Sequence, residues 1–386
     1  MVSFTLLADE NIPAVDTYFG AFASIRRVAG RTLDHSQLQG VDLLLVRSVT
    51  RVDEALLRGS AVKFVGTATS GFDHIDRDYL AQHNIGFAHA PGSNANSVVE
   101  YVLAAIAAVE DKLERLLGGG SIGIIGYGVI GKAVAARFDA LGIRCRIYDP
   151  WLAQHTIPYP AGLDDVLRCD VVTVHAQLTN AQPWPSFHLL GRRELERLQR
   201  GSLLINASRG SVIDNFALLD YLDAVPDQPV VLDVWEGEPA VNAALLDKVT
   251  LGTAHIAGYS LDGKLQATRM LRDAAAGYLG LPPVSPTSGG QAPAPIQLPA
   301  NLVGAGLLRY LLQNRYDIVE DDSLLREAVA AEVQTRRAGA GFDRLRKTYR
   351  ERRELAGSAV NALALPEQTA LARALGCTAV DTSAVE

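Results

Sequence analysis

The sequence has few of the features that mark secreted, membrane or nucleic-acid-binding proteins. Its 386 residues include only 3 cysteines, at positions 145, 169 and 377, without metal-ligand spacing, which predicts reduced, structural thiols. The net charge of -7 provides no basic field for nucleic acid or an anionic membrane. The N-terminal segment VSFTLLADENIP lacks the basic start and long apolar run of a signal peptide. We therefore expect a cytoplasmic protein that binds neither nucleic acid nor membrane.

A long apolar run is also missing. The longest apolar helical pattern, around Val98 to Val109, contains Glu100 and is too short to span a bilayer. The overall hydrophobic content of 48% is nevertheless ample for globular cores, and the length suggests two or three domains.

Short apolar runs alternate with helical patterns along most of the chain. Such runs are typical of parallel strands buried on both faces, so we expect an α/β fold with two doubly wound, Rossmann- or flavodoxin-like domains. The expected strands are residues 5–8, 43–46, 63–66, 86–88, 122–125, 144–148, 170–174, 203–206, 230–233 and a short one near 250.

The last quarter of the chain has a different composition. Six prolines, with Gly289 and Gly290, lie between positions 282 and 299, which predicts an extended linker over residues 281–300. Residues 301–386 predict a small α+β domain, with helices over 302–312 and 342–355 and possible strands at 317–319 and 358–363. A domain of this size buries little surface alone, so we expect it to dock or to form a homodimer.

A glycine-rich motif, GYGVIG, runs from Gly126 to Gly131 between an expected strand and an expected helix. In this setting the glycines permit a tight turn, close approach of a pyrophosphate and close helix packing, while the helix amides bind the phosphates. Asp149 ends the next strand, 23 residues after Gly126, where a carboxylate accepts ribose hydroxyls and repels a 2′-phosphate. The motif favours NAD binding over the alternative of a structural turn followed by an N-cap aspartate.

Three further polar residues follow consecutive expected strands. Arg209 follows INAS, Glu238 follows VVLDVWEG, and His255 follows the short strand near Thr250. Because parallel strands end at one sheet edge, a single cleft could hold a carboxylate-binding guanidinium and a histidine oriented by a carboxylate. Taken alone, Arg209 is equally compatible with an ordinary surface arginine, and a lone histidine is more often structural.

Together, GYGVIG with Asp149, INASRG, DVWEGEP and TAHIAGY resemble the D-isomer-specific 2-hydroxyacid dehydrogenases over about residues 1–280. The segments RSVT, KFVGTATSGFDHID and FDRLRKTYRERREL resemble the branch of that family that has a third domain and a phosphorylated substrate. This resemblance implies oxidation of 4-phospho-D-erythronate to 3-hydroxy-2-oxo-4-phosphobutanoate, by hydride transfer from C2 to NAD, in pyridoxal 5′-phosphate biosynthesis.

The resemblance also implies roles for individual residues. His255 would take the C2 hydroxyl proton, Glu238 would raise its basicity, and Arg209 would hold the substrate carboxylate and C2 oxygen; no metal is expected. The implied cofactor contacts are Gly126, Tyr127, Gly128, Val129, Ile130, Gly131, Asp149, Ala176, Asp233 and Gly258, and the implied substrate contacts are Ser48, Thr69, Tyr259 and Arg47.

The domain limits implied by the resemblance are 1–93 with 258–280 for a substrate-binding lid, 94–257 for NAD binding and 301–386 for dimerisation. One segment departs from the family: VTVHAQL has Ala176 where close relatives have a threonine that touches the cofactor. Six basic residues lie between Arg344 and Arg353, either on a solvated helix face or at a dimer interface with Arg346, Lys347 or Arg350 directed at the substrate phosphate.

Two other functions stay open at this point. A related NAD-dependent enzyme, such as 3-phosphoglycerate dehydrogenase or a hydroxypyruvate or glyoxylate reductase, would share the fold and the three strand-end residues. An NADH-sensing corepressor-like binding protein would share the fold alone, because fold does not fix function.

Overall fold

The computed structural model describes residues 4–281, 294–299, 301–335, 338–361 and 365–379. The chain divides into two compact units, each built from two separate stretches of sequence. Unit 1 contains residues 1–94 and 260–292, and unit 2 contains residues 95–259 and 293–386. Among the described residues, no helix is long and apolar enough to cross a bilayer.

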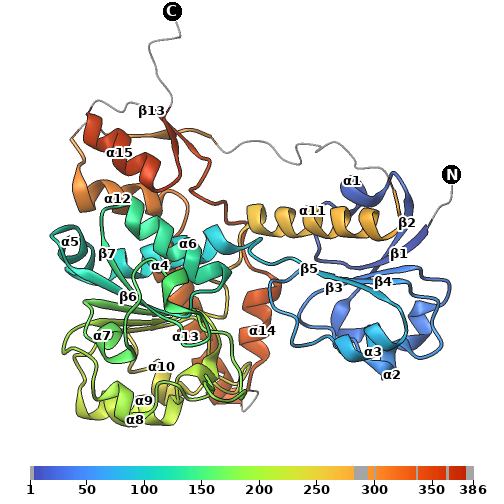
Figure 1. Cartoon of the computed structure of the whole chain (residues 1–386), viewed down its shortest axis with the longest axis horizontal. Coiled ribbons are helices and arrows are strands. Elements are labelled where there is room, and N and C mark those ends of the chain that lie inside the picture. The colour runs from blue at the N-terminus through green and yellow to red at the C-terminus, as the bar shows by residue number, and fades with distance from the viewer. Residues whose placement is uncertain (1–3, 282–293, 300, 336–337, 362–364, 380–386) are drawn as a thin grey trace, which may run out of the picture. The chain divides into compact units, whose positions relative to one another are not determined.

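Unit 1 is a parallel sheet covered by helices on both faces. Its strand order, β2-β1-β3-β4-β5, reverses direction beside β1, as in flavodoxin-like sheets. Figure 1 shows α11 lying along this sheet, where Leu271 and Ala275 pack with Leu6 and Leu45 in one apolar cluster. The strands are β1 Phe4–Asp9, β2 Ala23–Val28, β3 Leu43–Val46, β4 Phe64–Thr67 and β5 Gly86–His89. The helices are α1 Val15–Phe19, α2 Glu54–Leu57, α3 Arg77–Gln82 and α11 Leu261–Tyr278, with 3-10 turns η1 Gly30–Thr32 and η2 His35–Leu38.

Unit 2 contains a six-stranded parallel sheet in the order β11-β10-β9-β8-β6-β7. The strand order reverses between β6 and β8, and such a reversal opens a crevice at the carboxyl ends of the strands. The strands are β6 Ser121–Ile125, β7 Arg144–Tyr148, β8 Val171–Val174, β9 Leu203–Asn206, β10 Val230–Leu232 and β11 Leu251–Gly252. The helices are α4 Ala95–Ala108, α5 Lys112–Leu117, α6 Val129–Ala140, α7 Leu163–Leu167, α8 Arg192–Leu195, α9 Asn215–Ala224 and α10 Ala243–Leu246, with 3-10 turns η3 Gln154–Thr156 and η4 Gly210–Val212.

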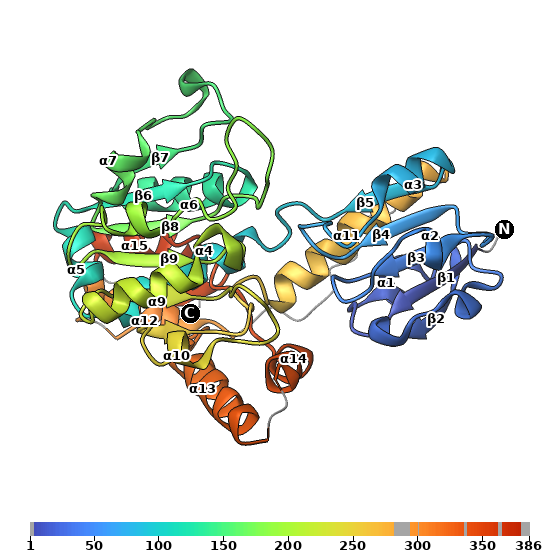
Figure 2. The same ribbon diagram turned by 90° about the horizontal axis from the view of Figure 1, so that it is seen from below.

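The C-terminal residues of unit 2 pack on this sheet domain and share its cores. Leu307 and Leu311 lie in the same apolar cluster as Val102 and Ile106 of α4, and Figure 1 shows α12 beside α4. Figure 2 shows α13 and α14 next to each other in the same unit. The helices are α12 Gly304–Gln313, α13 Ile318–Thr335, α14 Ala340–Lys347 and α15 Pro366–Ala374; β12 Ile296–Gln297, β13 Ala359–Asn361 and β14 Thr378–Ala379 form a small parallel sheet.

The α/β class with two parallel sheets and a small C-terminal sheet is confirmed. Two local predictions are wrong: of residues 317–319, expected as a strand, Ile318 and Val319 begin helix α13, and the helix expected over 342–355 ends at Lys347. Three strands, β2, β12 and β14, were not predicted. Of the expected linker, residues 282–293 and 300 lie outside the described residues, and Ile296–Gln297 form β12.

Candidate functional site

The glycine motif connects β6 to α6 at the point where the strand order reverses. Gly126 has φ +93°, and a Cβ there would lie 2.6 Å from the backbone nitrogen of Ala176. A Cβ at Gly131 would collide with the carbonyl oxygen of Gly126, so any side chain would push α6 away from the loop. A Cβ at Gly128 would meet nothing within 4 Å, which leaves the start of α6 accessible. This cradle fits a dinucleotide pyrophosphate.

The rest of the motif lines the same helix start. Val129 is 53% exposed, whereas Tyr127 and Ile130 pack partly on the core. Asp149, at the end of β7, accepts the Tyr127 N–H at 2.8 Å and the Trp151 N–H at 3.0 Å. These two bonds fix the carboxylate beside the loop, where it can accept ribose hydroxyls.

The departing segment around Ala176 keeps its backbone against the loop, because Gly126 packs directly on His175 and Ala176. The imidazole of His175 is buried and lies 2.9 Å from the hydroxyl of Thr173. Burial lowers the pKa of His175 to about 3, so this ring is neutral and unsuited to proton transfer near neutral pH.

Glu238 and His255 are in direct contact in the predicted site. Their strands, β10 and β11, are neighbours, and Oε2 of Glu238 lies 2.8 Å from Nδ1 of His255. The other oxygen of Glu238 accepts the Trp235 N–H at 2.8 Å. Burial acts to raise the pKa of Glu238, but His255, the Trp235 N–H and Arg346 outweigh it and leave this pKa lowered. The carboxylate is therefore ionised and holds one edge of the imidazole.

Asp233 supports the segment that carries His255. It is buried at the end of β10 and accepts the Thr253 hydroxyl and the Ile256 N–H, each at 2.7 Å, and the Ala257 N–H at 2.9 Å. The His255 backbone has φ +54°, a conformation that costs energy for a residue with a side chain. The hydrogen bonds to Asp233 compensate for this cost. They also fix the backbone of residues 256 and 257, which precede Gly258.

Arg209 emerges from β9, next to β10, on a loop shaped by Asn206. The amide oxygen of Asn206 accepts the Ser208 N–H at 3.1 Å, and its amide nitrogen donates to the Arg209 carbonyl at 3.0 Å. Gly210 lies so close to the backbone of Trp235 and Glu236 that a Cβ would collide with it. The loop of Arg209 and the segment that leads to Glu238 are therefore packed backbone to backbone.

Ser48, Thr69 and Arg47 belong to unit 1. Ser48 is exposed just after β3, and the Thr69 hydroxyl lies 2.7 Å from both the Thr67 hydroxyl and the Gly71 carbonyl. Arg47 donates from Nε to Oδ1 of the buried Asp9 at 3.0 Å, so part of its guanidinium is already engaged.

Lys264, near the start of α11, is a neighbour of Arg47. The sequence did not predict it as a site residue. Burial, and then the charge of Arg47, lower the pKa of Lys264. A helical lysine shows no pattern that would separate it from a surface residue, so only the fold reveals this pair of cations.

Tyr259 lies in unit 2, against the C-terminal residues. Its ring makes an edge contact with the ring of Tyr349, with centroids 5.8 Å apart, and the guanidinium of Arg346 lies 5.5 Å from its centre. Arg350 instead pairs with Asp321 and Glu320, and Arg352 is buried. Of the three basic residues considered for the phosphate, Arg346 lies beside the site, Arg350 is held elsewhere and Lys347 is exposed.

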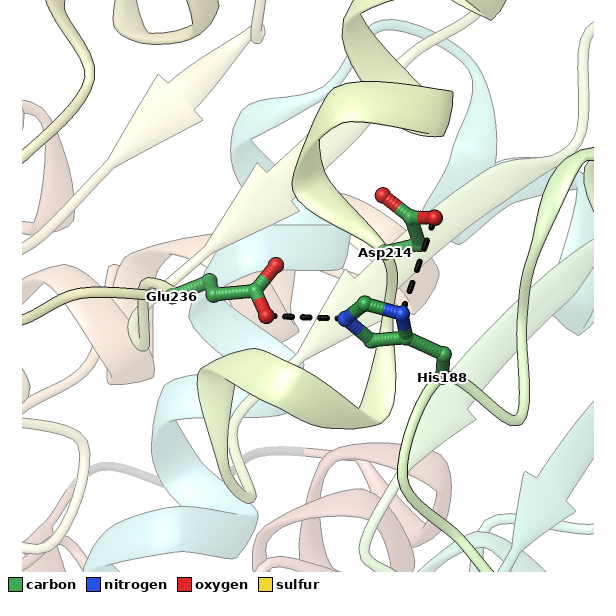
Figure 3. A group of neighbouring side chains, drawn as sticks. All are labelled: His188, Asp214 and Glu236. Carbon is green, nitrogen blue, oxygen red and sulfur yellow. Dashed lines mark hydrogen bonds and ion pairs between the residues drawn. The ribbon is translucent and has the colours of Figure 1, made fainter.

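A second histidine cluster contains His188, Asp214 and Glu236 (Figure 3). It includes a residue of the segment that leads to Glu238. Nε2 of His188 is 2.8 Å from Glu236, and Nδ1 is 3.6 Å from Asp214. The three side chains offer atoms close enough to hold a metal ion. However, each ring nitrogen faces a different carboxylate, so one ion could use only one nitrogen. The imidazole therefore bridges the two carboxylates.

Residues 104–257 match the family described as the D-isomer specific 2-hydroxyacid dehydrogenase, NAD binding domain, and residues 293–376 match a domain of unknown function, DUF3410. Solved structures share the fold. One is a D-lactate dehydrogenase from Aquifex aeolicus, with TM-score 0.58, 23% identity, and coverage of 72% of this chain and 95% of that chain. Another is a 3-phosphoglycerate dehydrogenase from Entamoeba histolytica, with TM-score 0.61, 20% identity, and coverage of 72% and 96%. Fold and site together define an NAD-dependent dehydrogenase.

Longer similarities narrow this class. The erythronate-4-phosphate dehydrogenase of Cellvibrio japonicus is 45% identical, over 90% of this chain and 92% of its own length. That of Stutzerimonas stutzeri is 43% identical, over 96% and 98%. The chain therefore belongs to the erythronate-4-phosphate dehydrogenases, a branch of the D-isomer-specific 2-hydroxyacid dehydrogenase family.

Proposed function

We propose that this protein oxidises 4-phospho-D-erythronate to 3-hydroxy-2-oxo-4-phosphobutanoate, as a step of pyridoxal 5′-phosphate biosynthesis. The observation that carries the proposal is the Glu238–His255 pair at 2.8 Å, beside the Arg209 loop, in a chain that matches relatives named for this activity over 92% and 98% of their length. During the reaction the C2 hydroxyl loses its proton and C2 loses a hydride, so C2 becomes a carbonyl carbon.

The three strand-end residues divide the work on the substrate. Because Nδ1 of His255 bonds to Glu238, Nε2 is the nitrogen that accepts the C2 hydroxyl proton. The ionised Glu238 stabilises the imidazolium that forms. Arg209 binds the substrate carboxylate and the C2 oxygen through its planar guanidinium.

NAD, when bound, supplies the acceptor of the C2 hydride. Gly126, Gly128 and Gly131 leave room for its pyrophosphate, and Asp149 binds the adenosine ribose. We assign further cofactor contacts to Tyr127, Val129, Ile130, the backbone of Ala176, Asp233 and Gly258, and substrate contacts to Ser48, Thr69, Arg47 and Tyr259.

The deciding experiment follows NADH fluorescence with 4-phospho-D-erythronate or 3-phosphoglycerate, in the presence of a 2-oxo acid that reoxidises bound NADH. We expect turnover with the erythronate only. Oxidation of 3-phosphoglycerate alone would replace this substrate and leave the mechanism standing. His255→Ala should abolish turnover and retain NADH binding, whereas His155→Ala, an exposed histidine, should change neither.

The related dehydrogenases remain the second candidate, and the C-terminal residues argue against them. The named relatives match 90% and 96% of the chain, whereas the D-lactate and 3-phosphoglycerate dehydrogenases cover only 72% of it. An enzyme that shares the DUF3410 residues is the better analogue.

A homodimer through the C-terminal residues and a cytoplasmic location are also part of the proposal. Val319 and Val333 of α13 are 51% and 64% exposed, and their spacing puts them within roughly 40° on one helix face. Self-association along this helix face would cover both side chains. Replacing both with aspartate should give a monomer in analytical sedimentation, and an unchanged sedimentation coefficient would contradict this interface. The cytoplasmic location rests on three unpaired, buried cysteines.

A further inference from the structure

Two arginines of the segment from Arg344 to Arg353 are bound to structural partners. Arg352 donates to the carbonyl oxygens of Ser97, at 2.8 Å, and Ala257, at 3.4 Å, deep in unit 2. Arg350 forms ion pairs with Asp321 and Glu320. Both guanidinium groups therefore hold the C-terminal residues in place and are not available to a ligand.

Arg346 is different. It is half-buried on α14, and within the described part of the chain no ion pair with a carboxylate is found for it. Its Nε is buried without a hydrogen-bond partner, while its guanidinium lies over the rings of Tyr259, at 5.5 Å, and Phe342, at 5.9 Å. A half-buried cation with an unsatisfied donor is costly unless a ligand provides the missing anion.

Helix α14 also lies directly against the segment of Glu238. Gly339, just before α14, has φ +85°, and a Cβ there would come within 2.7 Å of the Pro239 ring, the residue after Glu238. The charge of Arg346 is close enough to contribute to the lowered pKa of Glu238, after the larger influences of burial, His255 and the Trp235 N–H. The contact of Arg346 with the Tyr259 ring and the packing of Gly339 on Pro239 therefore place this part of α14 near the proton-transfer pair.

We propose that Arg346, supplied by the C-terminal residues of the same chain, binds the phosphate group of the substrate. The inference rests on the proposed function, because it requires a substrate with a second anion besides the carboxylate held by Arg209. A guanidinium forms paired, charge-assisted bonds to phosphate oxygens, and here the rings of Tyr259 and Phe342 keep its plane in position. The DUF3410 residues thereby become part of substrate selection.

The test compares a phosphorylated substrate with its unphosphorylated counterpart. In Arg346→Met, which keeps an apolar stem, kcat/KM for 4-phospho-D-erythronate should fall about 10- to 100-fold through KM, a much larger loss than for D-erythronate, because only the phosphorylated substrate loses an anion contact. Arg346→Lys should recover part of the loss. The matched control is Lys347→Met, an exposed neighbour on the same helix, which should leave both substrates unaffected.

A second readout does not depend on turnover. Calorimetric titration of inorganic phosphate into the NADH-bound protein should give heat with the native chain and with Lys347→Met, and none with Arg346→Met. Equal losses for both substrates in Arg346→Met, or phosphate selectivity lost in Arg47→Met instead, would overturn the inference. If the native protein does not oxidise 4-phospho-D-erythronate at all, the proposed function fails, and the phosphate titration still decides whether Arg346 binds the anion.

Discussion

Replacing Glu238 with glutamine should convert His255 into the wrong tautomer. The Trp235 N–H donates to one side-chain oxygen of Glu238, at 2.8 Å, so the glutamine carbonyl must take that place. The amide nitrogen then points at Nδ1 of His255, which lies 2.8 Å from the other oxygen. Because an amide nitrogen can only donate, Nδ1 must be unprotonated and the proton must sit on Nε2, the nitrogen that should receive the substrate proton.

The expected loss follows from removing general-base catalysis and the counter-charge of the imidazolium together. We expect kcat to fall about 10²- to 10⁴-fold, equivalent to ~3–5 kcal/mol in the activation free energy. The measurement is single-turnover NADH formation in a stopped-flow instrument, with NADH affinity determined in parallel to confirm that the cofactor site is intact.

The matched control is Glu236→Gln. This carboxylate lies two positions earlier and contacts His188 and Asn215, with no bond to His255. Its replacement should lower kcat less than tenfold, because the proton-transfer pair keeps its charge and tautomer. The reasoning is refuted if Glu238→Gln retains kcat within tenfold of the native value, or if Glu236→Gln loses as much.

Three further predictions follow from packing and burial. Gly131→Ala should weaken NADH binding at least tenfold in fluorescence titrations, because its methyl group would collide with the Gly126 carbonyl and displace α6; the control is Gly277→Ala in α11, where a methyl group meets nothing and no cofactor contact is proposed. Burial raises the pKa of Glu100 from 4.5 to about 7. The folded state therefore binds this proton more tightly than the unfolded state, and the free energy of unfolding in urea should fall by up to about 3 kcal/mol as pH rises from about 4.5 to about 7. Glu100→Gln should remove this dependence. Burial raises the pKa of Cys145 and Cys377 to about 12, so a disulfide reagent should label them only after denaturation.

The central strands could be predicted from the sequence because their residues are apolar and buried on both faces. Strand β2 was missed because it lies at a sheet edge, where Arg26 and Arg27 disrupt the apolar run. The β-branched pair Ile318 and Val319 suggested a strand, but these residues begin an 18-residue helix whose buried positions recur along one side. At both places tertiary packing, and not local residue propensity, decides the secondary structure.

The sequence predicted those parts of the candidate site that directly follow the ends of strands. The carboxyl ends of β9, β10 and β11 are adjacent, which places Arg209, Glu238 and His255 on neighbouring connections. The partner of each charge could not be predicted, because it depends on contacts between distant segments. The ion pair of Arg47 with Asp9 and the different surroundings of Arg346 and Arg350 are examples.

The close fit of Gly210 against the Trp235–Glu236 backbone has a consequence for recombination between relatives. A chimera with its crossover between these positions would join a loop from one parent to a segment from another, and a difference of one methyl group would separate them. Exchanges that keep residues 203–238 from a single parent should therefore yield active hybrids more often than exchanges that divide this stretch. In recombination between relatives, the loop of Arg209 and the segment that leads to Glu238 must therefore come from the same parent.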